Sequence, residues 1–466
     1  MKILVAIANY GTGNDKYLSQ VLDEFRRMPH DIDLVVTSNI AKNIAPDVEV
    51  IVGLPTKNPK SLPFAHKKLF ADQLESYDLF IYTEDDILIT DRNINAFLQA
   101  SSLLANDELL GFFRSETDSY GKIYFPDVHY HYHWDPASVS QRDNYTFAYF
   151  TNLHSGCYAL TKQQLKRAIE SGGFVVPPHE GTYEPLETAA TDPYTQCGFR
   201  KMICVSHIND FIVPHLSNRY AGKGSLEAED FYAQLKMLSS LSKNGKPKST
   251  LFPVETQLLH QRWSKSYYEP CQEELIALIP EGTRSVLSIG CGWGATEEHL
   301  IKRGIKVKAI PIDAVIAASA EARGIEIAYG DNRKLANERF DCLLISNVLH
   351  LVRDPVEFLV SFTPLSPDGC VIASVPNLSK LRRLFRGLQL RGHVVNPKSY
   401  EAHGMHLTNG RVIQRWFRQA GLRPAKVVYE VSDKKRSADR RSLGLAKPML
   451  AETVYVLAES RPSHSS

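Results

Sequence analysis

A glycine-rich turn in the second half of the chain is the stretch best suited to binding a cofactor. The apolar run 286–289 predicts a buried strand, and the turn after it supplies the expected contacts Gly290, Cys291, Gly292 and Gly294. Glycines remove the Cβ atoms that would block close approach, and a helix starting at Ala295 would present free backbone N–H groups. This spacing leaves two cofactors open, a nicotinamide dinucleotide and S-adenosylmethionine.

The residues downstream of the turn favour S-adenosylmethionine. A strand predicted over 307–312 ends at Asp313, close to the acidic position that usually holds a cofactor ribose, and another strand is predicted over 340–345. With a fifth strand at 371–375, the succession resembles the class I S-adenosylmethionine-dependent methyltransferases over roughly residues 256–460. The resemblance implies a Rossmann-like α/β domain. It also implies cofactor contacts from Asp313, Asp331, Asn332 and Asn347.

The position of Asp313 departs from the family pattern. In the family the ribose-binding acid usually follows the second strand's apolar residues directly, where this chain has Pro311. A local bulge would have to bring Asp313 to the ribose, unless it instead caps the helix predicted after it. On the adenine side, the run 332–335 carries no acid where many relatives have one, so Asp331 is the stronger expectation.

Two histidines are the expected catalytic residues for methyl transfer. The reaction is a displacement at a sulfonium carbon, which depends on alignment, and a hydroxyl acceptor also needs a base. His350 follows the fourth predicted strand, and His406 lies in a segment that resembles one of small-molecule methyltransferases. For each histidine the alternative is a purely structural role.

Three consecutive acids in the first half of the chain predict a cation site. Glu84, Asp85 and Asp86 directly follow a hydrophobic strand predicted from residue 77. Burying several carboxylates beside a strand end is unfavourable unless a cation compensates them. Mg²⁺ or Mn²⁺ takes hard oxygen ligands and would neutralise a departing diphosphate. The alternative is a solvated loop or a set of helix-capping acids.

The acid cluster and the strand predicted over 3–8 resemble the metal-binding motif and first nucleotide-binding strand of GT-A glycosyltransferases. The resemblance implies a nucleotide-sugar donor held through a divalent metal by Asp85, Asp86 and a late histidine. His215 is the expected histidine, and His207 competes for that role.

The same resemblance implies a carboxylate that acts as base on the acceptor hydroxyl. The polar stretch 181–192 offers Glu184, Glu187 and Asp192, of which Asp192 is favoured. A separate feature is the alternation of histidine and tyrosine over 129–133. On a strand, its three histidines would share one face and contact sugar, lie at the surface or form a metal site.

Length and composition indicate two soluble α/β domains. The chain has 466 residues, of which 43% are hydrophobic and 23% charged, and its formal net charge of +2 gives no case for a nucleic-acid partner. The turn-forming stretch 242–249 predicts a GT-A-like domain over 1–245 and a methyltransferase domain over 246–466. Seven cysteines without a C-x-x-C pair suit a reducing cytosol, and no apolar run is long enough to span a membrane.

Together these features predict a cytoplasmic bifunctional enzyme that builds and O-methylates a glycan, such as a bacterial surface polysaccharide or glycolipid. The basic amphipathic stretch 380–391 would touch the inner membrane face or a lipid-linked acceptor, or would instead cap the active site. One alternative keeps the methyltransferase and makes the first half a non-catalytic module that binds carbohydrate or a partner. Another has a small molecule or protein methylated with no sugar involved.

Overall fold

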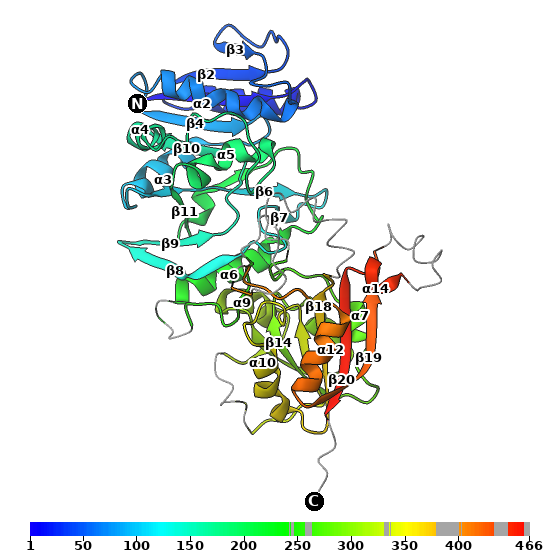
Figure 1. Ribbon diagram of the computed structural model, residues 1–466. Coiled ribbons are helices and arrows are strands. Elements are labelled where there is room, and N and C mark those ends of the chain that lie inside the picture. The colour runs from blue at the N-terminus through cyan, green and yellow to red at the C-terminus, as the bar shows by residue number, and fades with distance from the viewer. Residues whose placement is uncertain are drawn as a thin grey trace, which may run out of the picture. The chain divides into compact units, whose positions relative to one another are not determined.

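The chain folds into two compact units, Met1–Lys243 and Asn244–Ser466. The computed structural model describes residues 1–241, 243, 247–256, 263–329, 335, 337–378, 400–401, 403–432 and 446–460. Both units combine helices with strands, and in the first unit the strands β5 to β10 follow one another without a helix between them (Figure 1).

The first unit is built on a five-stranded sheet in the order β10-β4-β1-β2-β3. Its strands are β1 (Lys2–Asn9), β2 (Asp31–Ser38), β3 (Val48–Val52), β4 (Leu79–Glu84) and β10 (Cys157–Thr161). Strands β1 to β4 run parallel, and β10 pairs antiparallel with β4. Continuous apolar runs make β1 and β4 buried along almost their whole length, as expected for parallel strands covered on both faces.

Two four-stranded sheets complete the first unit, in the orders β5-β11-β9-β8 and β12-β6-β7-β13. Their strands are β5 (Glu108–Leu110), β6 (Phe113–Thr117), β7 (Ile123–Phe125), β8 (Trp134–Arg142), β9 (Tyr145–Phe150), β11 (Arg200–Cys204), β12 (Ile212–Pro214) and β13 (Leu226–Glu227). The helices of this unit are α1 (Asp15–Arg27), α2 (Ala65–Asp72), α3 (Asp91–Ser101), α4 (Lys162–Glu170), α5 (Pro185–Thr195) and α6 (Ala228–Leu241).

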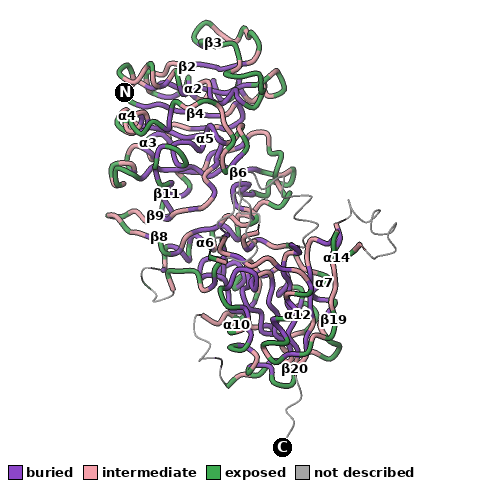
Figure 2. The backbone as a smooth tube through the Cα atoms, in the orientation of Figure 1, coloured by how far each residue is buried: buried purple, intermediate pink, exposed green. Residues whose placement is uncertain are grey.

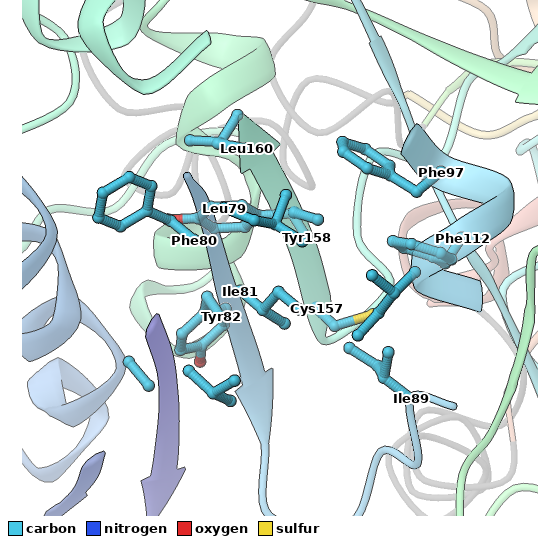
Figure 3. Close-up of a cluster of buried hydrophobic side chains, with 14 of the residues drawn as sticks. Leu79, Phe80, Ile81, Tyr82, Ile89, Phe97, Phe112, Cys157, Tyr158 and Leu160 are labelled. Atoms are coloured by element: carbon cyan, nitrogen blue, oxygen red, sulfur yellow. The ribbon is translucent and has the colours of Figure 1, made fainter. Parts of the chain in front are cut away.

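The hydrophobic core of the first unit fixes the end of β4. Side chains from β4 and β10 lie together there, close to Phe97 and Phe112, whose rings stack with centroids 6.2 Å apart (Figure 3). Each large apolar side chain buried in this way contributes roughly 1.5–3 kcal/mol. Burial follows the sheets, whereas the chain around β3 is largely exposed (Figure 2). The acids after β4 are therefore carried by one of the best-packed strands.

The second unit is built on a seven-stranded sheet in the order β16-β15-β14-β17-β18-β20-β19. Its strands are β14 (Ser285–Cys291), β15 (Lys306–Pro311), β16 (Glu326–Ile327), β17 (Cys342–Ser346), β18 (Cys370–Pro376), β19 (Leu422–Glu430) and β20 (Thr453–Ser460). All neighbouring strands are parallel except β20, which runs antiparallel to both β18 and β19. The predicted Rossmann-like sheet is confirmed, and its strand order reverses at β14, where such sheets bind ligands.

The helices of the second unit are α7 (Glu273–Ile276), α8 (Ala295–Lys302), α9 (Ala314–Ala322), α10 (Pro355–Phe362), α12 (Gly410–Gln419) and α14 (Lys447–Leu450). The sequence predicts a long helix over 256–279 before β14, and within the described residues this is wrong, since only α7 is an α-helix there. Pro270 disfavours helical backbone before it, and Lys265 N instead bonds to Val254 O at 2.8 Å. The non-helical backbone runs along the glycine turn instead.

Candidate functional site

The acid cluster lies at the carboxyl end of the parallel strands in the first unit. Glu84 ends β4, and Asp85 and Asp86 occupy the turn that follows. The neighbouring strand β1 runs parallel to β4, and the chain continues from β1 to β2 and β3 on its other side. This reversal of strand order places the acids at the edge where open α/β sheets bind ligands.

The carboxylates of the cluster are buried, and their compensation is uneven, since Asp86 pairs with His215 and Arg219 whereas Glu84 and Asp85 form no ion pair among the described residues. Asp85 accepts hydrogen bonds from the side-chain amides of Asn9 and Asn14, each at 2.7 Å. Burial raises the pKa of Asp85 to about 6 and the pKa of Glu84 to about 7, although Arg114 opposes the shift of Glu84. A bound cation would favour the ionised forms of both carboxyl groups and lower their pKa values again.

His215 contacts two of the acids in this region. Its Nε2 lies 3.1 Å from Asp86 Oδ2, and its Nδ1 lies 2.5 Å from Glu116 Oε1. Burial disfavours the charged imidazole, but the hydrogen bonds to both carboxylates outweigh burial and raise the pKa of His215 to about 9. Burial likewise opposes ionisation of Asp86, yet its pKa is lowered, chiefly by the bond from His215. The sequence missed Glu116 as the second partner of this histidine.

A cavity of about 630 Å³ opens over the acid cluster. Its basic lining residues are Lys60, Arg114, Arg219 and Lys223. Tyr10, Tyr130 and Tyr220 also line it and keep about half or more of their surface exposed, at 53%, 69% and 46%. Acids, bases and open aromatic rings in one cavity suit a ligand that carries phosphate and a flat or sugar ring.

The predicted metal site is not confirmed. Within the part of the chain that the structure describes, no group of three or more histidine, cysteine and acidic side chains is arranged to hold a metal ion. Asp86 and His215 form a contacting pair, while Asp85 is engaged by two asparagine amides. Carboxylate oxygen and imidazole nitrogen are donors that Mn²⁺ accepts, but the raised pKa of His215 keeps its imidazole protonated near pH 7, so this histidine would have to release a proton to bind such an ion.

The two predicted catalytic acids have different surroundings. Glu187 lines the cavity, and burial raises its pKa. Asp192 has no exposed surface and forms an ion pair with Lys67, which is 2% exposed. The preference for Asp192 as the acceptor base is therefore corrected, because this carboxylate is buried against a lysine and is not among the residues that line the cavity. His207 and Glu184 also lie outside that lining.

The histidines of 129–133 do not form a shared face. The segment is a turn between β7 and β8, and Tyr130 has a left-handed backbone with φ of 50°. His129 lines the cavity and bonds through Nδ1 to Pro126 O at 2.7 Å. Burial lowers the pKa of His131 to about 4. Only His129 of the three is placed to contact a ligand in the cavity.

In the second unit the glycine turn is packed closely against the segment before it. Gly290 has a φ of 79°, which an L side chain rarely adopts, and a Cβ on Gly292 would lie under 3.0 Å from Tyr267 O. Trp293 N donates to the same carbonyl at 2.9 Å. A small cavity of about 10 Å³ remains beside the turn. The turn is thus a backbone cradle that only glycine can form.

The predicted cofactor contacts beyond the turn have mixed outcomes. Asp313 is fully buried, and its Oδ1 accepts from Val315 N and Ile316 N at 2.8 and 2.9 Å, so it caps α9. The capping alternative is therefore observed, and a ribose contact from this carboxyl stays a prediction. Asp331 and Asn332 lie outside the described residues, as does the whole basic stretch 380–391.

Asn347 belongs to a polar network at the carboxyl ends of β14, β17 and β18. It has a left-handed backbone with φ of 49°, and its Nδ2 donates to Glu269 Oε1 at 3.0 Å. Glu269 Oε2 also accepts from Lys265 Nζ at 2.7 Å and from Ser346 Oγ at 2.8 Å. Sequence reasoning missed Lys265 and Glu269, although opposite charges four residues apart, ahead of a glycine turn, were a usable signal.

His350 and His406 are neighbours in space. His406 N donates to His350 O at 2.7 Å. His350 Nε2 lies 2.8 Å from Trp263 O, so Nε2 carries the proton and Nδ1 keeps its lone pair. Burial lowers the pKa of His350 to about 4, which leaves it neutral near pH 7. His406 Nε2 contacts the backbone carbonyl of Val352 at 3.0 Å, which occupies that nitrogen.

Comparison with known proteins identifies the second unit. Residues 261–427 match a family described as "Methyltransferase domain". A ubiquinone biosynthesis O-methyltransferase of Cereibacter sphaeroides is 28% identical over 181 residues, which cover 37% of this chain and 63% of that protein. An uncharacterized methyltransferase of Mycobacterium tuberculosis is 28% identical over 165 residues, covering 34% of this chain and 78% of that protein. The chain thus spans less than two thirds of the Cereibacter relative.

Solved structures also align with this chain. A SAM-dependent methyltransferase from Archaeoglobus fulgidus shares 16% identity with a TM-score of 0.31, covering 40% of this chain and 90% of that one. Magnesium protoporphyrin IX methyltransferase from Synechocystis shares 14% identity with a TM-score of 0.29, covering 41% and 80%. The family match lies within the second unit, which carries a methyltransferase domain on its Rossmann-like sheet. In the described part of the chain, no helix has the length and apolarity needed to cross a membrane.

Proposed function

We propose that the chain is a bifunctional enzyme that methylates a hydroxyl group with S-adenosylmethionine and transfers a sugar from a nucleotide-sugar. The family match and the glycine cradle at the carboxyl end of β14 carry the methyl-transfer half of this proposal. S-Adenosylmethionine supplies an activated methyl group on a sulfonium. Gly290 and Gly292 form the turn that lines the cavity where the cofactor would bind, and Asn347 contributes a side-chain amide at the neighbouring strand end.

His350 is the proposed base for the acceptor hydroxyl. Its Nε2–H is held by Trp263 O, so the lone pair on Nδ1 is the group able to take a proton. The lowered pKa keeps this histidine neutral near pH 7 with the Nδ1 lone pair available, and it also makes the imidazole a weak base. His406 supports the same segment through its bond to His350 O. O-Methylation agrees with the printed name of the Cereibacter relative, which concerns that protein.

The cavity over the acid cluster carries the sugar-transfer half of the proposal. Burial raises the pKa values of Glu84 and Asp85, which favours a ligand that brings a cation, and Asp86 and His215 would be two ligands of that cation, with Asp85 beside them. Arg219 and Lys223 line the same cavity and would meet the diphosphate of the donor. Glu187 is the proposed base on the acceptor, which would be a glycan or glycolipid. A lipid-linked acceptor would bring the protein to the inner membrane face.

A second candidate keeps only the methyltransferase activity. In the described residues the acid cluster provides no three-ligand metal group, and this favours a first unit that binds carbohydrate or a partner without catalysis. The two candidates differ in whether a nucleotide binds and whether it needs metal.

Thermal shift of the full chain separates these candidates. S-Adenosylhomocysteine, UDP, GDP, CMP and dTDP are each tested with and without Mn²⁺. Stabilisation by S-adenosylhomocysteine, and by one nucleotide only when Mn²⁺ is present, supports both activities and identifies the donor class. A response to S-adenosylhomocysteine alone favours the binding module. No response to S-adenosylhomocysteine contradicts the methyltransferase assignment.

A further inference from the structure

An ion pair with no assigned role lines the small cavity beside the glycine turn. Lys265 is 1% exposed, and its Nζ lies 2.7 Å from Glu269 Oε2 and 2.7 Å from Ser346 O. Both charged residues line the cavity together with Gly290 and Gly292. The pair therefore lies between the ends of β14 and β17, where the strand order of the sheet reverses.

The backbone of this segment is fastened to the glycine turn. Tyr267 O accepts from Trp293 N at 2.9 Å, and Glu269 O accepts from Trp293 Nε1 at 2.5 Å. Glu269 is also tied to the end of β17 beside the turn, through Ser346 Oγ and Asn347 Nδ2. These contacts hold one positive and one negative side chain at a fixed place on the cofactor side of the sheet.

A buried ion pair is a weak source of stability. Removing two charges from water is unfavourable, and their attraction repays it only when every remaining polar position is satisfied. A pair that served stability alone would gain nothing from lining the cofactor cavity. A pair that binds a ligand with one negative and one positive group must line the cavity. The ligand's negative group can then take the place of the glutamate beside the lysine, and its positive group the place of the lysine beside the glutamate, so that no charge is left unpaired.

We propose that Lys265 and Glu269 recognise the amino-acid end of the methyl donor, with the lysine binding its carboxylate and the glutamate its ammonium group. This inference rests on the methyltransferase function proposed above. The two side chains neutralise each other across 2.7 Å, beside a cavity of about 10 Å³ that must widen to admit the cofactor. Binding exchanges their mutual contact for two contacts with the ligand, so both charges stay compensated throughout.

Three ligands and calorimetric titration of the full chain test this assignment. S-Adenosylhomocysteine has both charged groups, its decarboxylated analogue keeps only the ammonium, and methylthioadenosine has neither. Lys265→Met should weaken S-adenosylhomocysteine by about 10- to 100-fold, the range for losing a charged hydrogen bond, and leave the other two ligands unchanged. Glu269→Gln should weaken both aminated ligands and leave methylthioadenosine unchanged.

Two further variants separate recognition from folding. Lys308 forms bonds of 2.7 Å to both carboxylate oxygens of Glu338 and is absent from the cavity lining, so Lys308→Met is the matched loss of an ion pair in the same unit. It should change none of the three affinities. Lys265→Arg keeps the charge and should retain most of the affinity for S-adenosylhomocysteine even where Lys265→Met folds poorly.

The outcomes distinguish this inference from the function on which it rests. Equal weakening of all three ligands by Lys265→Met would show that the lysine only supports the fold of the turn. Unchanged affinity of Lys265→Met and Glu269→Gln for S-adenosylhomocysteine would overturn the assignment while leaving the methyltransferase function in place. Failure of the wild-type chain to bind S-adenosylhomocysteine would remove the proposed function itself.

Discussion

Substitution of Gly292 by alanine should damage both the stability of the second unit and its affinity for S-adenosylhomocysteine. The added Cβ would lie under 3.0 Å from Tyr267 O and 3.1 Å from its carbonyl carbon, closer than real Cβ atoms approach oxygen. The obstacle is backbone, so no side-chain rotation relieves it. The segment that carries Lys265 and Glu269 must move away from the turn.

The magnitude follows from the two interactions that are lost. Overpacking of this kind costs about 1–3 kcal/mol. The bond from Trp293 N to Tyr267 O, at 2.9 Å, contributes about 1 kcal/mol more. The sum of about 2–4 kcal/mol corresponds to a fall in melting temperature on the order of 10 °C for a unit of this size. If half of that sum of about 2–4 kcal/mol is lost from the binding free energy of S-adenosylhomocysteine, its Kd rises about tenfold.

Scanning calorimetry and titration with S-adenosylhomocysteine measure the two effects of Gly292→Ala. Gly13→Ala is the control for the loss of glycine itself, since nothing lies within 4 Å of the Cβ it would add. Gly13→Ala should leave both quantities unchanged. A Gly292→Ala protein with wild-type melting temperature and wild-type Kd would refute the close packing of the turn and its place in the cofactor site.

Three further predictions concern the first unit. Asp192→Asn leaves the buried ammonium of Lys67 without its counter-charge and should destabilise the unit by about 3–5 kcal/mol, measured by urea unfolding, whereas a catalytic role would reduce turnover and spare stability. Glu187→Gln should lower sugar transfer by about 10²- to 10⁴-fold with unchanged nucleotide affinity, and equal activity would exclude it as the base. The rise in the pKa of His215 from 6.5 to about 9 adds about 3 kcal/mol to the free energy of unfolding of this unit. This contribution is fully present below pH 6.5 and is lost as the pH rises through 9. The stability advantage of the wild type over His215→Gln should therefore shrink between pH 6.5 and pH 10, and a constant difference would contradict the charged pair with Asp86.

The sequence predicted those features that depend on local patterns. The strand before the glycine turn is predicted over 286–289 and observed as Ser285–Cys291, because an apolar run bounded by glycines has few other stable forms. The cluster Glu84 to Asp86 was located for the same reason, at the end of a hydrophobic strand. Left-handed Asn347 was also singled out from the motif in which it lies.

Features that depend on tertiary contacts could not be read from local patterns. Asp192 is a polar residue in a polar stretch, and only the fold shows that it lies against Lys67, which is 125 positions away. The segment around Tyr267 has helix-compatible composition, yet its carbonyl is used by Trp293 and Pro270 interrupts it. Long-range hydrogen bonds outweighed local propensity at both places.

The two candidate sites share one arrangement and differ in the charge that remains unpaired. Each lies at the carboxyl ends of parallel strands where the strand order reverses. In the first unit, burial raises the pKa values of Glu84 and Asp85 in a cavity that also carries basic side chains, so this pair of acids favours a ligand that arrives with a cation. In the second unit Lys265 and Glu269 cancel, so the site favours a ligand that is itself a zwitterion. Both units share one order of parallel strands, β3-β2-β1-β4 in the first and β16-β15-β14-β17 in the second. The charged side chains at the ends of these strands therefore indicate the ligand class of each site more directly than the strand order does.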